Sequence, residues 1–480
     1  MHLKQPTVQI LTQDQYVQIE ETTFRLLEEV GIRLQHPRAV EMLRAQGCTV
    51  QGERVLIPRA VVAWSLVNID HNAVFRSADG SREVILGQDQ FLVHNGGSVP
   101  NFEDMETCQR RPARLQDLVD GTRILDALPN IDVVIPLVGP QDVPEELITI
   151  ASFEVMLHCT NKPIAGAAVE NPTDVRYMIE LASACCGGRE AFLARPTIPI
   201  LASPISPLTF TEKVTSAILA IVDAGAAFFP LPAPTMGASG PITMAGVLAQ
   251  QHAEVLASIV ITAAAHPGST VVYCSRINPI DMRTGVSWWG GPDMGMAGAC
   301  ATHLAHRSGL LSDVYGLCTS SAALDPRFAY EKFANALMPA LAGADILSGA
   351  GTMDSGMTAT LAGAVIDNEM ISLVHHILRG YEVNEETLAF EVMKKVILTD
   401  DIFLGQLHTV KHLRDGTIWF PQISDSGIHS GSDTSAGVAA SARARVRELL
   451  EASAQDTLTE AVCADLTKIM EEARRELVKS

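Results

Sequence analysis

The sequence repeats one pattern eight times, and this repetition constrains the fold more than any other feature. In each repeat, a short run of β-branched or other apolar residues is followed by a segment whose apolar positions have helical spacing. The apolar runs cover residues 91–94, 131–135, 163–166, 197–201, 227–231, 270–274, 313–316 and 345–349. The helical segments cover residues 114–128, 144–160, 172–186, 211–224, 243–265, 292–309, 327–342 and 360–379.

Eight strand–helix repeats of this size predict a parallel sheet that closes on itself, which is the α/β fold of a (β/α)8 TIM barrel. We assign the barrel to residues 89–380 of the 480-residue chain. Residues 1–88 form an N-terminal cap and residues 381–480 a C-terminal helical extension, and both are predicted to be mainly helical.

The N-terminal cap opens with the capping-box pattern of Thr12 and Gln15, followed by apolar residues at helical spacing up to Gly31. A second helix is predicted at residues 37–46, and small strands are predicted within residues 54–88.

The C-terminal extension has no strand pattern after residue 380. Helices are predicted at residues 384–398 and 436–453. The pattern Thr457-x-x-Glu460 opens a last helix with a long apolar face.

Composition excludes several classes of protein. The chain has 55 acidic and 35 basic side chains, a formal net charge of −20, which repels nucleic acid. Polar residues, Gly or Pro interrupt every apolar stretch, so we predict no membrane span. The first residues lack a secretory signal, and the nine cysteines are scattered without a Cys-x-x-Cys pair. We therefore expect reduced thiols and a cytoplasmic location.

The first predicted strand runs into the loop His94-Asn95-Gly96-Gly97-Ser98-Val99-Pro100-Asn101. In a (β/α)8 barrel the reacting groups follow the C-terminal ends of the strands, where helix N-termini also point. Adjacent glycines permit close approach of the backbone to a ligand. We predict that His94 and Asn95 bind the substrate. The alternative is that these side chains hydrogen-bond only to neighbouring backbone carbonyls.

The loop after the sixth predicted strand offers an aromatic surface and a positive charge. Trp288 and Trp289 are adjacent in a chain with four tryptophans, and an aromatic wall attracts a quaternary ammonium through cation–π interaction. Arg276 can pair with a substrate carboxylate in bidentate geometry. The alternatives are that Trp288 packs beneath the loop and that Arg276 forms a structural ion pair.

The loops after the seventh and eighth strands complete the predicted barrel mouth and supply Cys318, Met353 and Asp354 as candidate substrate-binding residues. The glycine-rich stretch 349–356 lacks the lysine of a P-loop and the spacing of a dinucleotide fingerprint, which argues against nucleotide binding. His408, one helical turn before a second histidine, is the candidate from the C-terminal extension.

No sequence pattern indicates covalent or metal-dependent catalysis. The chain has no Gly-x-Ser-x-Gly elbow, and no signature pairs Cys318 with a base. The closely spaced His303 and His306 lack acidic companions at ligand spacing. We predict no metal-ligating residues and assign no catalytic residue.

Six longer stretches are more specific than any single residue. They are Tyr330-Glu331-Lys332, 337–345, 349–357, 365–369, Gly290-Gly291-Pro292-Asp293 and Gln406-Leu407-His408-Thr409. Together they resemble the trimethylamine methyltransferase family over nearly the whole chain. The resemblance implies a (β/α)8 enzyme whose substrate pocket lies at the barrel mouth, and whose methyl acceptor is a corrinoid (cobalamin) cofactor carried by a cognate partner protein.

One departure from the family pattern bears on the substrate. Members that act on trimethylamine carry pyrrolysine after the seventh strand, near the position of Leu317 and Cys318 here. The ordinary residues at this place favour the branch that resembles glycine betaine:corrinoid methyltransferases. The resemblance therefore implies transfer of a methyl group from a quaternary amine, such as glycine betaine, to Co(I) of the partner.

Two other functions remain open from the residues alone. A metal-dependent barrel lyase or hydrolase would need His and carboxylate ligands at several strand ends. A sensor would bind a methylated amine without turnover. The long apolar faces of the terminal helices are also compatible with a homo-oligomer.

Overall fold

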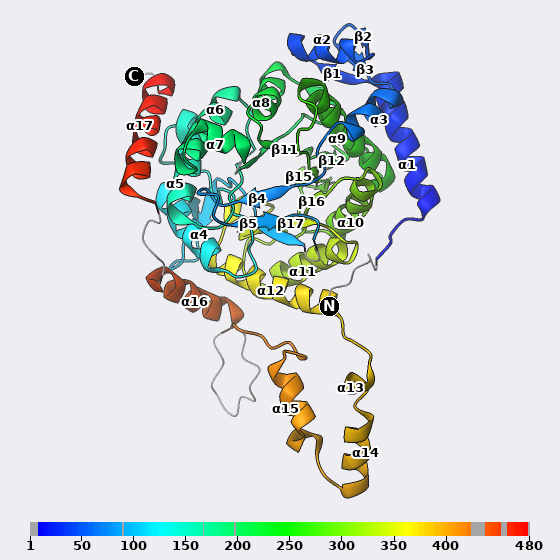
Figure 1. Cartoon of the computed structure of the whole chain (residues 1–480), viewed down its shortest axis with the longest axis vertical. Coiled ribbons are helices and arrows are strands. Elements are labelled where there is room, and N and C mark those ends of the chain that lie inside the picture. Colours follow the sequence, from blue (N-terminus) through cyan, green and yellow to red (C-terminus); the bar gives the residue numbers. More distant parts are fainter. Residues whose placement is uncertain are drawn as a thin grey trace.

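The computed structural model describes residues 8–88, 91–166, 168–195, 198–423, 437–452 and 458–478. At its centre, parallel strand segments form a ring surrounded by helices (Figure 1). Six of the strands are β6 (Leu92–Asn95), β9 (Pro199–Ala202), β11 (Ala227–Pro230), β13 (Tyr273–Ser275), β16 (Ser312–Tyr315) and β17 (Ile346–Ala350). Two further segments, around Val133 and Ile164, join the ring through single parallel bridges.

The pairings close the ring. The strands β13, β16, β17 and β6 are neighbours in one sheet, and β9 pairs with β11. Parallel bridges complete the circuit: His94 to Val133, Val134 to Ile164, Ala168 to Leu201, and Phe228 to Val271. The predicted (β/α)8 barrel is therefore confirmed. The second and third strands pair only briefly because Pro136 and Pro163 have no N–H group to donate.

Helices follow the strands close to the predicted positions. They are α4 (Leu115–Ala127), α5 (Ile148–Cys159) with the short η2 (Glu145–Leu147), α6 (Pro172–Cys185), α7 (Arg189–Ala194), α8 (Glu212–Asp223), α9 (Met244–Ala265), α10 (Pro292–Arg307), α11 (Pro326–Leu341) and α12 (Leu361–Arg379). Side-chain caps set the starts of α6, α8, α11 and α12, because Asn171, Thr211, Asp325 and Thr360 each accept a hydrogen bond from a first-turn N–H group.

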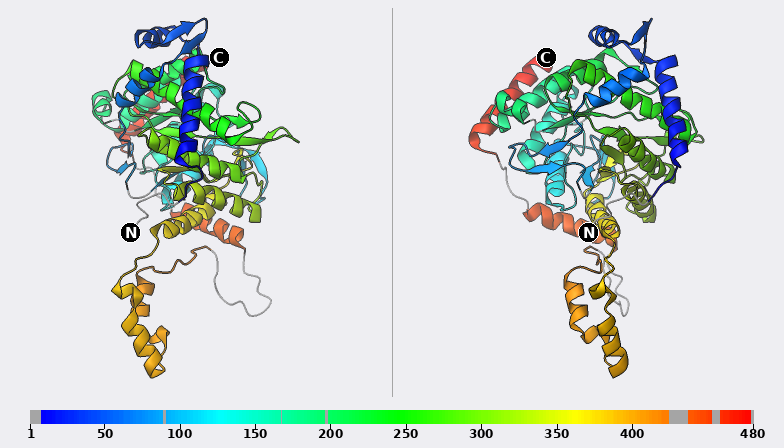
Figure 2. Two further views of the ribbon diagram at one scale, coloured as in Figure 1. Left: turned by 90° about the vertical axis from the view of Figure 1, so that its right-hand side faces the viewer. Right: turned by 45° about the vertical axis from the view of Figure 1, so that its right-hand side comes forward.

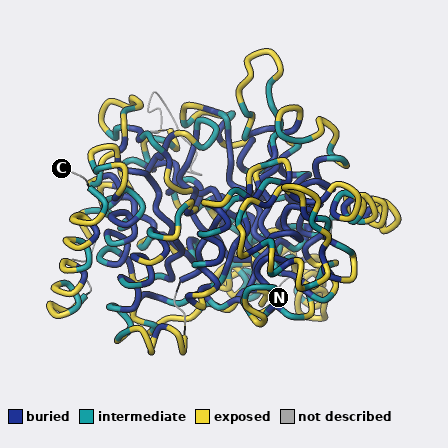
Figure 3. The backbone as a smooth tube through the Cα atoms, turned by 90° about the horizontal axis from the view of Figure 1, so that it is seen from above, coloured by how far each residue is buried: buried dark blue, intermediate teal, exposed yellow. Residues whose placement is uncertain are grey.

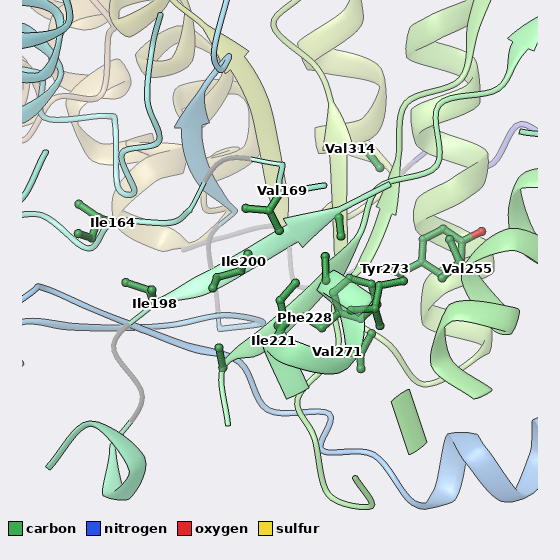
Figure 4. Packing of buried hydrophobic residues seen from close by; sticks show 14 of the residues in the cluster. Ile164, Val169, Ile198, Ile200, Ile221, Phe228, Val255, Val271, Tyr273 and Val314 are labelled. Carbon is green, nitrogen blue, oxygen red and sulfur yellow. The ribbon is translucent and has the colours of Figure 1, made fainter. Parts of the chain in front are cut away.

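The barrel strands alternate between two buried faces. Phe228, Val271 and Tyr273 point outward and lie beside Ile221 of α8 and Val255 of α9 (Figure 4). Their neighbours in sequence point inward. There a separate apolar cluster fills the lower half of the barrel, which is the half where the strands begin. Buried residues are accordingly concentrated inside the ring, and exposed residues lie around it (Figure 3).

A hairpin from the N-terminal cap closes the lower end of the barrel. It consists of β4 (Val74–Arg76) and β5 (Glu83–Ile85). Phe75 packs inside the ring against Phe229, with ring centroids 5.8 Å apart at 74°. The apolar cluster below the mouth is therefore shared between the cap and the barrel strands.

The rest of the N-terminal cap includes a helix that the sequence patterns missed. The predicted helices appear as α1 (Gln13–Arg25), with the Thr12–Gln15 capping box, and α2 (Pro37–Ala45). Of the small strands, β3 (Arg54–Leu56) lies with β4 and β5 in the predicted stretch 54–88, whereas β1 (Ile32–Leu34) and β2 (Thr49–Gln51) precede it. Residues Arg59–Val67, for which no helix was predicted, form helix α3. This helix buries Val61 and Val62 in the core.

In the C-terminal extension, α16 (Val438–Ala452) packs on α12, and α17 (Glu460–Leu477) packs on α6. Thr459 caps α17, whereas the predicted cap, Thr457, lies outside the described residues. Between α12 and α16 are α13 (Glu385–Leu388), α14 (Phe390–Thr399), η3 (Phe403–Gly405) and α15 (Leu407–Arg414). These extend away from the side of the barrel (Figures 1 and 2). The domain boundaries at residues 88 and 380 stay predictions.

The sequence predicts that no segment is long enough to span a membrane, and helix α9 shows that this prediction is wrong as far as length is concerned. Among the helices of the described residues, it alone is long and apolar enough to cross a bilayer. However, 83% of its most apolar window is buried inside the protein. It also buries Gln250, Gln251 and Glu254, whose side chains form hydrogen bonds inside the protein. This is typical of a core helix.

Replacing Phe75 by Ala tests whether the hairpin is part of the barrel core. We expect a loss of about 3–5 kcal/mol in the free energy of unfolding, because a buried aromatic ring leaves a cavity. Urea denaturation followed by circular dichroism measures it. The control is Val67→Ala, at a side chain that is 82% exposed. A loss below about 1 kcal/mol for Phe75→Ala would mean that the hairpin contributes little to the core.

Candidate functional site

Two small sheets border the upper end of the barrel, where the strands finish. One contains β7 (Asn101–Glu103), β8 (Arg110–Pro112), β18 (Thr352–Met353) and β19 (Thr358–Ala359). The other contains β12 (Thr235–Met236), β14 (Asn278–Asp281) and β15 (Val286–Ser287). Between the loops lies a cavity of about 550 Å³, which is the size of a site for one small ligand.

The cavity combines aromatic, hydroxyl and basic side chains. His94, Arg276, Trp289 and Tyr315 line it, together with the hydroxyl groups of Ser98, Ser203, Ser287 and Ser355. Among the described residues that line the cavity, none is acidic. From these residues a ligand meets aromatic surface and hydrogen-bond donors.

Trp289 and Tyr315 form an aromatic corner. Their ring centroids are 5.2 Å apart at 76°, an edge-to-face arrangement. The backbone N–H of Trp289 donates to the hydroxyl of Ser320, and this hydroxyl is 2.8 Å from that of Ser355. Burial raises the pKa of Tyr315 to about 12, so its hydroxyl stays protonated at neutral pH. The corner is therefore held by its neighbours and carries no negative charge.

Below the aromatic corner, Asp313 pairs with two of the cavity residues. The Nη2 of Arg276 donates to both carboxylate oxygens of Asp313 at 2.9 Å. The Nη1 of Arg276 donates to the backbone oxygens of Ser275 and Asp313. Burial alone would raise the pKa of Asp313, but the positive charge of Arg276, followed by that of His94, holds this pKa well below its ordinary value.

His94 lies between two oxygen atoms. Its Nε2 is 3.3 Å from the Asp313 carboxylate, and its Nδ1 is 2.7 Å from the backbone oxygen of Asn95. Both oxygens only accept hydrogen bonds, so a doubly protonated imidazole can donate to both at once. The pair formed by Asp313 and Arg276 thus extends to His94 and fixes the orientation of its ring.

A second polar network lies beneath the loops and connects residues of several of the longer stretches singled out in the sequence. The carboxylate of Glu331 accepts hydrogen bonds from the hydroxyl of Thr319, the backbone N–H of Ser320 and the Nε of Arg327. A Cβ atom at Gly290 would lie 2.0 Å from this carboxylate. Glycine is therefore required where the loop before α10 passes over Glu331.

The neighbouring Lys332 forms a fully buried ion pair. Its Nζ donates to Asp367 at 2.7 Å, and the backbone N–H of Gly351 donates to the same oxygen at 2.7 Å. Because a buried charge is costly without a partner, this pair ties α11, α12 and the loop after β17 together. These residues support the mouth from below and do not line the cavity.

The structure brings four of the predicted site residues to the cavity: His94, Asn95, Arg276 and Trp289. The amide of Asn95 is hydrogen-bonded to Gly96 and to both backbone groups of Ile135, so it links two barrel strands. Arg276 pairs with Asp313, as the alternative interpretation of this residue anticipated.

The other five predicted residues lie elsewhere. Trp288 is 37% exposed and lies beside Gly291. Cys318 and Met353 are buried beneath the loops, and Cys318 contacts Met294. Asp354 pairs with Arg110 on the rim. His408 lies on α15, where its Nε2 is 3.3 Å from the backbone oxygen of Glu386.

Two residues of the site were missed in the sequence, namely Asp313 and Tyr315. A signal for both was present, because they alternate with buried Val314 on one strand. The period of two places them on the inner face together. A charged residue in the middle of a barrel strand indicates a partner inside the barrel.

Within the part of the chain that the structure describes, no group of three or more His, Cys, Asp or Glu side chains could hold a metal ion. The ionisable groups at the cavity instead pair with one another, as described above.

Comparison with known proteins gives a consistent result. A family model described as trimethylamine methyltransferase (MTTB) matches residues 1–478. The glycine betaine methyltransferase of Desulfitobacterium hafniense strain Y51 is 28% identical over 427 residues, which cover 88% of each chain. The trimethylamine methyltransferase of D. hafniense strain DSM 10664 / DCB-2 is 28% identical over 398 residues, 82% of this chain and 80% of the relative.

Among solved structures, the monomethylamine methyltransferase of Methanosarcina barkeri aligns with 99% of this chain and 97% of its own length. Its sequence identity is 13% and its TM-score is 0.49.

Substituting Asp313 by Asn tests the ion pair inside the barrel. We expect a loss of about 3–5 kcal/mol in the free energy of unfolding at pH 7, because Arg276 loses its buried counter-charge. A carboxylate with a lowered folded-state pKa stabilises the fold above its unfolded pKa of about 3.9 and loses this effect as the pH falls further. The deficit of the variant should therefore be largest above pH 5 and shrink below pH 4.

Urea denaturation at several pH values measures this difference. The control is Asp465→Asn, because Asp465 and its partner Lys468 are both exposed, and such pairs contribute about 0–1 kcal/mol. A deficit of the Asp313 variant that does not change with pH would contradict the assigned ionisation.

Proposed function

Since the chain belongs to the trimethylamine methyltransferase family, we propose that it transfers a methyl group from a quaternary amine, such as glycine betaine, to Co(I) of a cognate corrinoid protein. The chain is an enzyme of this methyltransferase family. The observation that carries the choice of substrate is the aromatic corner of Trp289 and Tyr315 in a cavity without acidic lining among the described residues.

A quaternary ammonium suits this corner because it has no N–H group to donate. Its charge is stabilised by the faces of aromatic rings, by about 2 kcal/mol when water is excluded. A carboxylate beside the cation would stabilise the substrate more than the transition state, since the positive charge disappears from nitrogen as the methyl group leaves. An aromatic wall opposes this loss of charge less than a carboxylate in contact would, because cation–π attraction is weaker than a desolvated ion pair.

The carboxylate of a betaine would find hydrogen-bond donors on other walls of the cavity. Ser98, Ser203 and Ser355 present hydroxyl groups. We propose that His94 and Arg276 orient the ligand from below, with their own orientation fixed by Asp313. Four other residues predicted for the substrate, Trp288, Cys318, Met353 and Asp354, would act from outside this lining, whereas His408 lies on α15, away from the cavity.

The reaction requires no acid or nucleophile from this chain. The C–N bond breaks with its electron pair left on nitrogen, so a neutral tertiary amine leaves without needing a proton. Burial raises the pKa of Cys318 to about 12, so this thiol stays neutral and does not attack. Catalysis by these residues would consist of removing water from the cation and aligning one N–CH3 bond with the open mouth.

The corrinoid, carried by the partner protein, would supply the Co(I) that accepts the methyl group. The cavity has the volume of a small-ligand site and opens at the strand ends, where the partner can approach. We place the enzyme in the cytoplasm, where buried thiols such as Cys274 and Cys300 stay reduced.

Methyl transfer to a reduced corrinoid protein tests the proposed function. We expect the absorbance of the corrinoid to change when the protein is mixed with glycine betaine or another quaternary amine, and to stay constant with trimethylamine. A panel of amines without carboxylates, such as choline, serves as the comparison. If ligands bind by calorimetry but no competent corrinoid protein is methylated, the chain is a sensor and the proposal fails.

Trp289→Ala tests the aromatic corner. We expect the Kd for glycine betaine to rise about 30-fold, because about 2 kcal/mol of cation–π stabilisation is lost. The isostere 3,3-dimethylbutanoate, which keeps the carboxylate but has carbon in place of the quaternary nitrogen, should lose much less, and Trp289→Phe should keep part of the affinity. Isothermal titration calorimetry compares the three proteins. Equal losses for the two ligands would mean that Trp289 only shapes the cavity.

A further inference from the structure

Three consecutive residues between β18 and β19 adopt a left-handed backbone conformation. The φ angles are 57° at Asp354, 55° at Ser355 and 73° at Gly356. Two of these residues carry a Cβ atom, for which this conformation is unfavourable. Residues held in such conformations occur mostly at functional sites, and Ser355 and Gly356 both line the cavity. The conformation of the turn therefore serves the cavity at the expense of local stability.

The turn is fixed to two neighbouring segments. The backbone N–H of Asp354 donates to the backbone oxygen of Ser321 at 2.8 Å, and that of Ser355 donates to the backbone oxygen of Thr319 at 3.0 Å. The Nη1 of Arg110, on β8, donates to the carboxylate of Asp354 at 2.7 Å. Because these contacts hold the turn on both sides, the hydroxyl of Ser355 has a defined position at the wall of the cavity.

The hydroxyl of Ser355 is the last group of a hydrogen-bonded chain. It lies 2.8 Å from the hydroxyl of Ser320, which accepts the backbone N–H of Trp289 at 2.9 Å. Ser320 is not among the described residues that line the cavity. When Ser320 donates to Ser355, the hydrogen atom of Ser355 is left to point into the cavity. A chain of hydrogen bonds in one direction strengthens its last donor, which suits an anionic acceptor.

The same turn lies beside the aromatic corner. Through Ser320, the hydroxyl of Ser355 is two hydrogen bonds away from the backbone of Trp289. A Cβ atom at Gly356 would lie 3.9 Å from the hydroxyl of Tyr315. The donor for an anion is therefore a neighbour of the aromatic surface that suits a cation, and one small ligand can contact both.

We propose that Ser355 binds the carboxylate of the substrate and that Ser320 is a positioning residue, which sets the distance between this carboxylate and the aromatic corner. The site then selects zwitterions whose carboxylate is on the carbon atom next to the quaternary nitrogen. This inference rests on the proposed function, because it takes a quaternary amine as the substrate. A longer zwitterion has to fold back to place both charges in neighbouring positions, which costs conformational entropy.

The wall across the ring from Tyr315 is mainly apolar. The third strand faces the seventh in an eight-stranded ring, and the residues of the second to fifth strands that line the cavity include Ile135, Ala168, Leu201 and Leu231. A carboxylate that reaches this wall loses hydration without compensation. Ser203, on the same side, forms no hydrogen bond with another described residue that would orient its hydroxyl.

Isothermal titration calorimetry with three ligands tests the proposal. Glycine betaine has one CH2 group between its charges, γ-butyrobetaine has three, and tetramethylammonium has no carboxylate. We expect the wild-type protein to bind glycine betaine at least about tenfold more tightly than γ-butyrobetaine. Ser355→Gly, which tolerates the left-handed turn, should raise the Kd for glycine betaine about tenfold or more, because a hydrogen bond to a charged group is lost. The Kd for tetramethylammonium should change less than about twofold.

Ser320→Ala tests the positioning role, because it leaves the hydroxyl of Ser355 but removes its link to Trp289. We expect the preference for glycine betaine over γ-butyrobetaine to fall below about threefold, and Ser320→Thr, which keeps a hydroxyl, to restore it. The control is Ser269→Ala, which removes a hydroxyl that donates to His266 before β13, at the opposite end of the barrel. It should keep the wild-type affinities, and thermal melts show that each variant is folded.

Equal losses of glycine betaine and tetramethylammonium in Ser355→Gly would overturn the proposal. So would a wild-type protein that binds γ-butyrobetaine as tightly as glycine betaine, or a preference that Ser320→Ala leaves unchanged. The titrations need no corrinoid protein, so the expected selectivity without any methyl transfer would support these roles of Ser355 and Ser320 while the transferase proposal fails. A wild-type protein that binds none of the three ligands would overturn both proposals.

Discussion

The buried ion pair between Arg276 and Asp313 is the interaction on which the site depends. It lies where the apolar filling of the barrel ends and the polar mouth begins. A charge in this position is tolerated only with its partner, because either group alone would lose its hydration without compensation. The pair joins β16 to the segment after β13 and fixes the ring of His94 on β6. One interaction thus links three parts of the barrel wall and sets the floor of the cavity.

Above this floor, the loops are held by one another. Ser320 connects Trp289 with Ser355, while Glu331 fixes Thr319 and Ser320 from below. Such a network keeps the aromatic corner in place before any ligand arrives, which lowers the entropy cost of binding. A methyl transfer that relies on positioning needs this order, because a displacement of about 1 Å at the reacting atom reduces the rate by two orders of magnitude.

The same chain has one part that is not stabilised by its own core. The barrel buries its strands on both faces, with helices outside and the hairpin of Phe75 below. The segment from Tyr381 to Phe420 keeps its apolar side chains exposed.

The sequence by itself determined the barrel, the order of its strands and helices, and the loop that carries His94 and Asn95. These follow from local periodicity and from helix caps such as Thr12, which act between residues close in the chain. Helix α3 was missed because its stability comes from contacts with α9, which no local pattern encodes.

Only the tertiary structure decided that Arg276 meets Asp313 and that Trp289, not Trp288, faces the cavity. It likewise placed His408 on α15, in the segment that extends away from the side of the barrel (Figure 1). The partners of these side chains lie tens of residues away, and their distances depend on how the ring closes, which is a property of all the strands together.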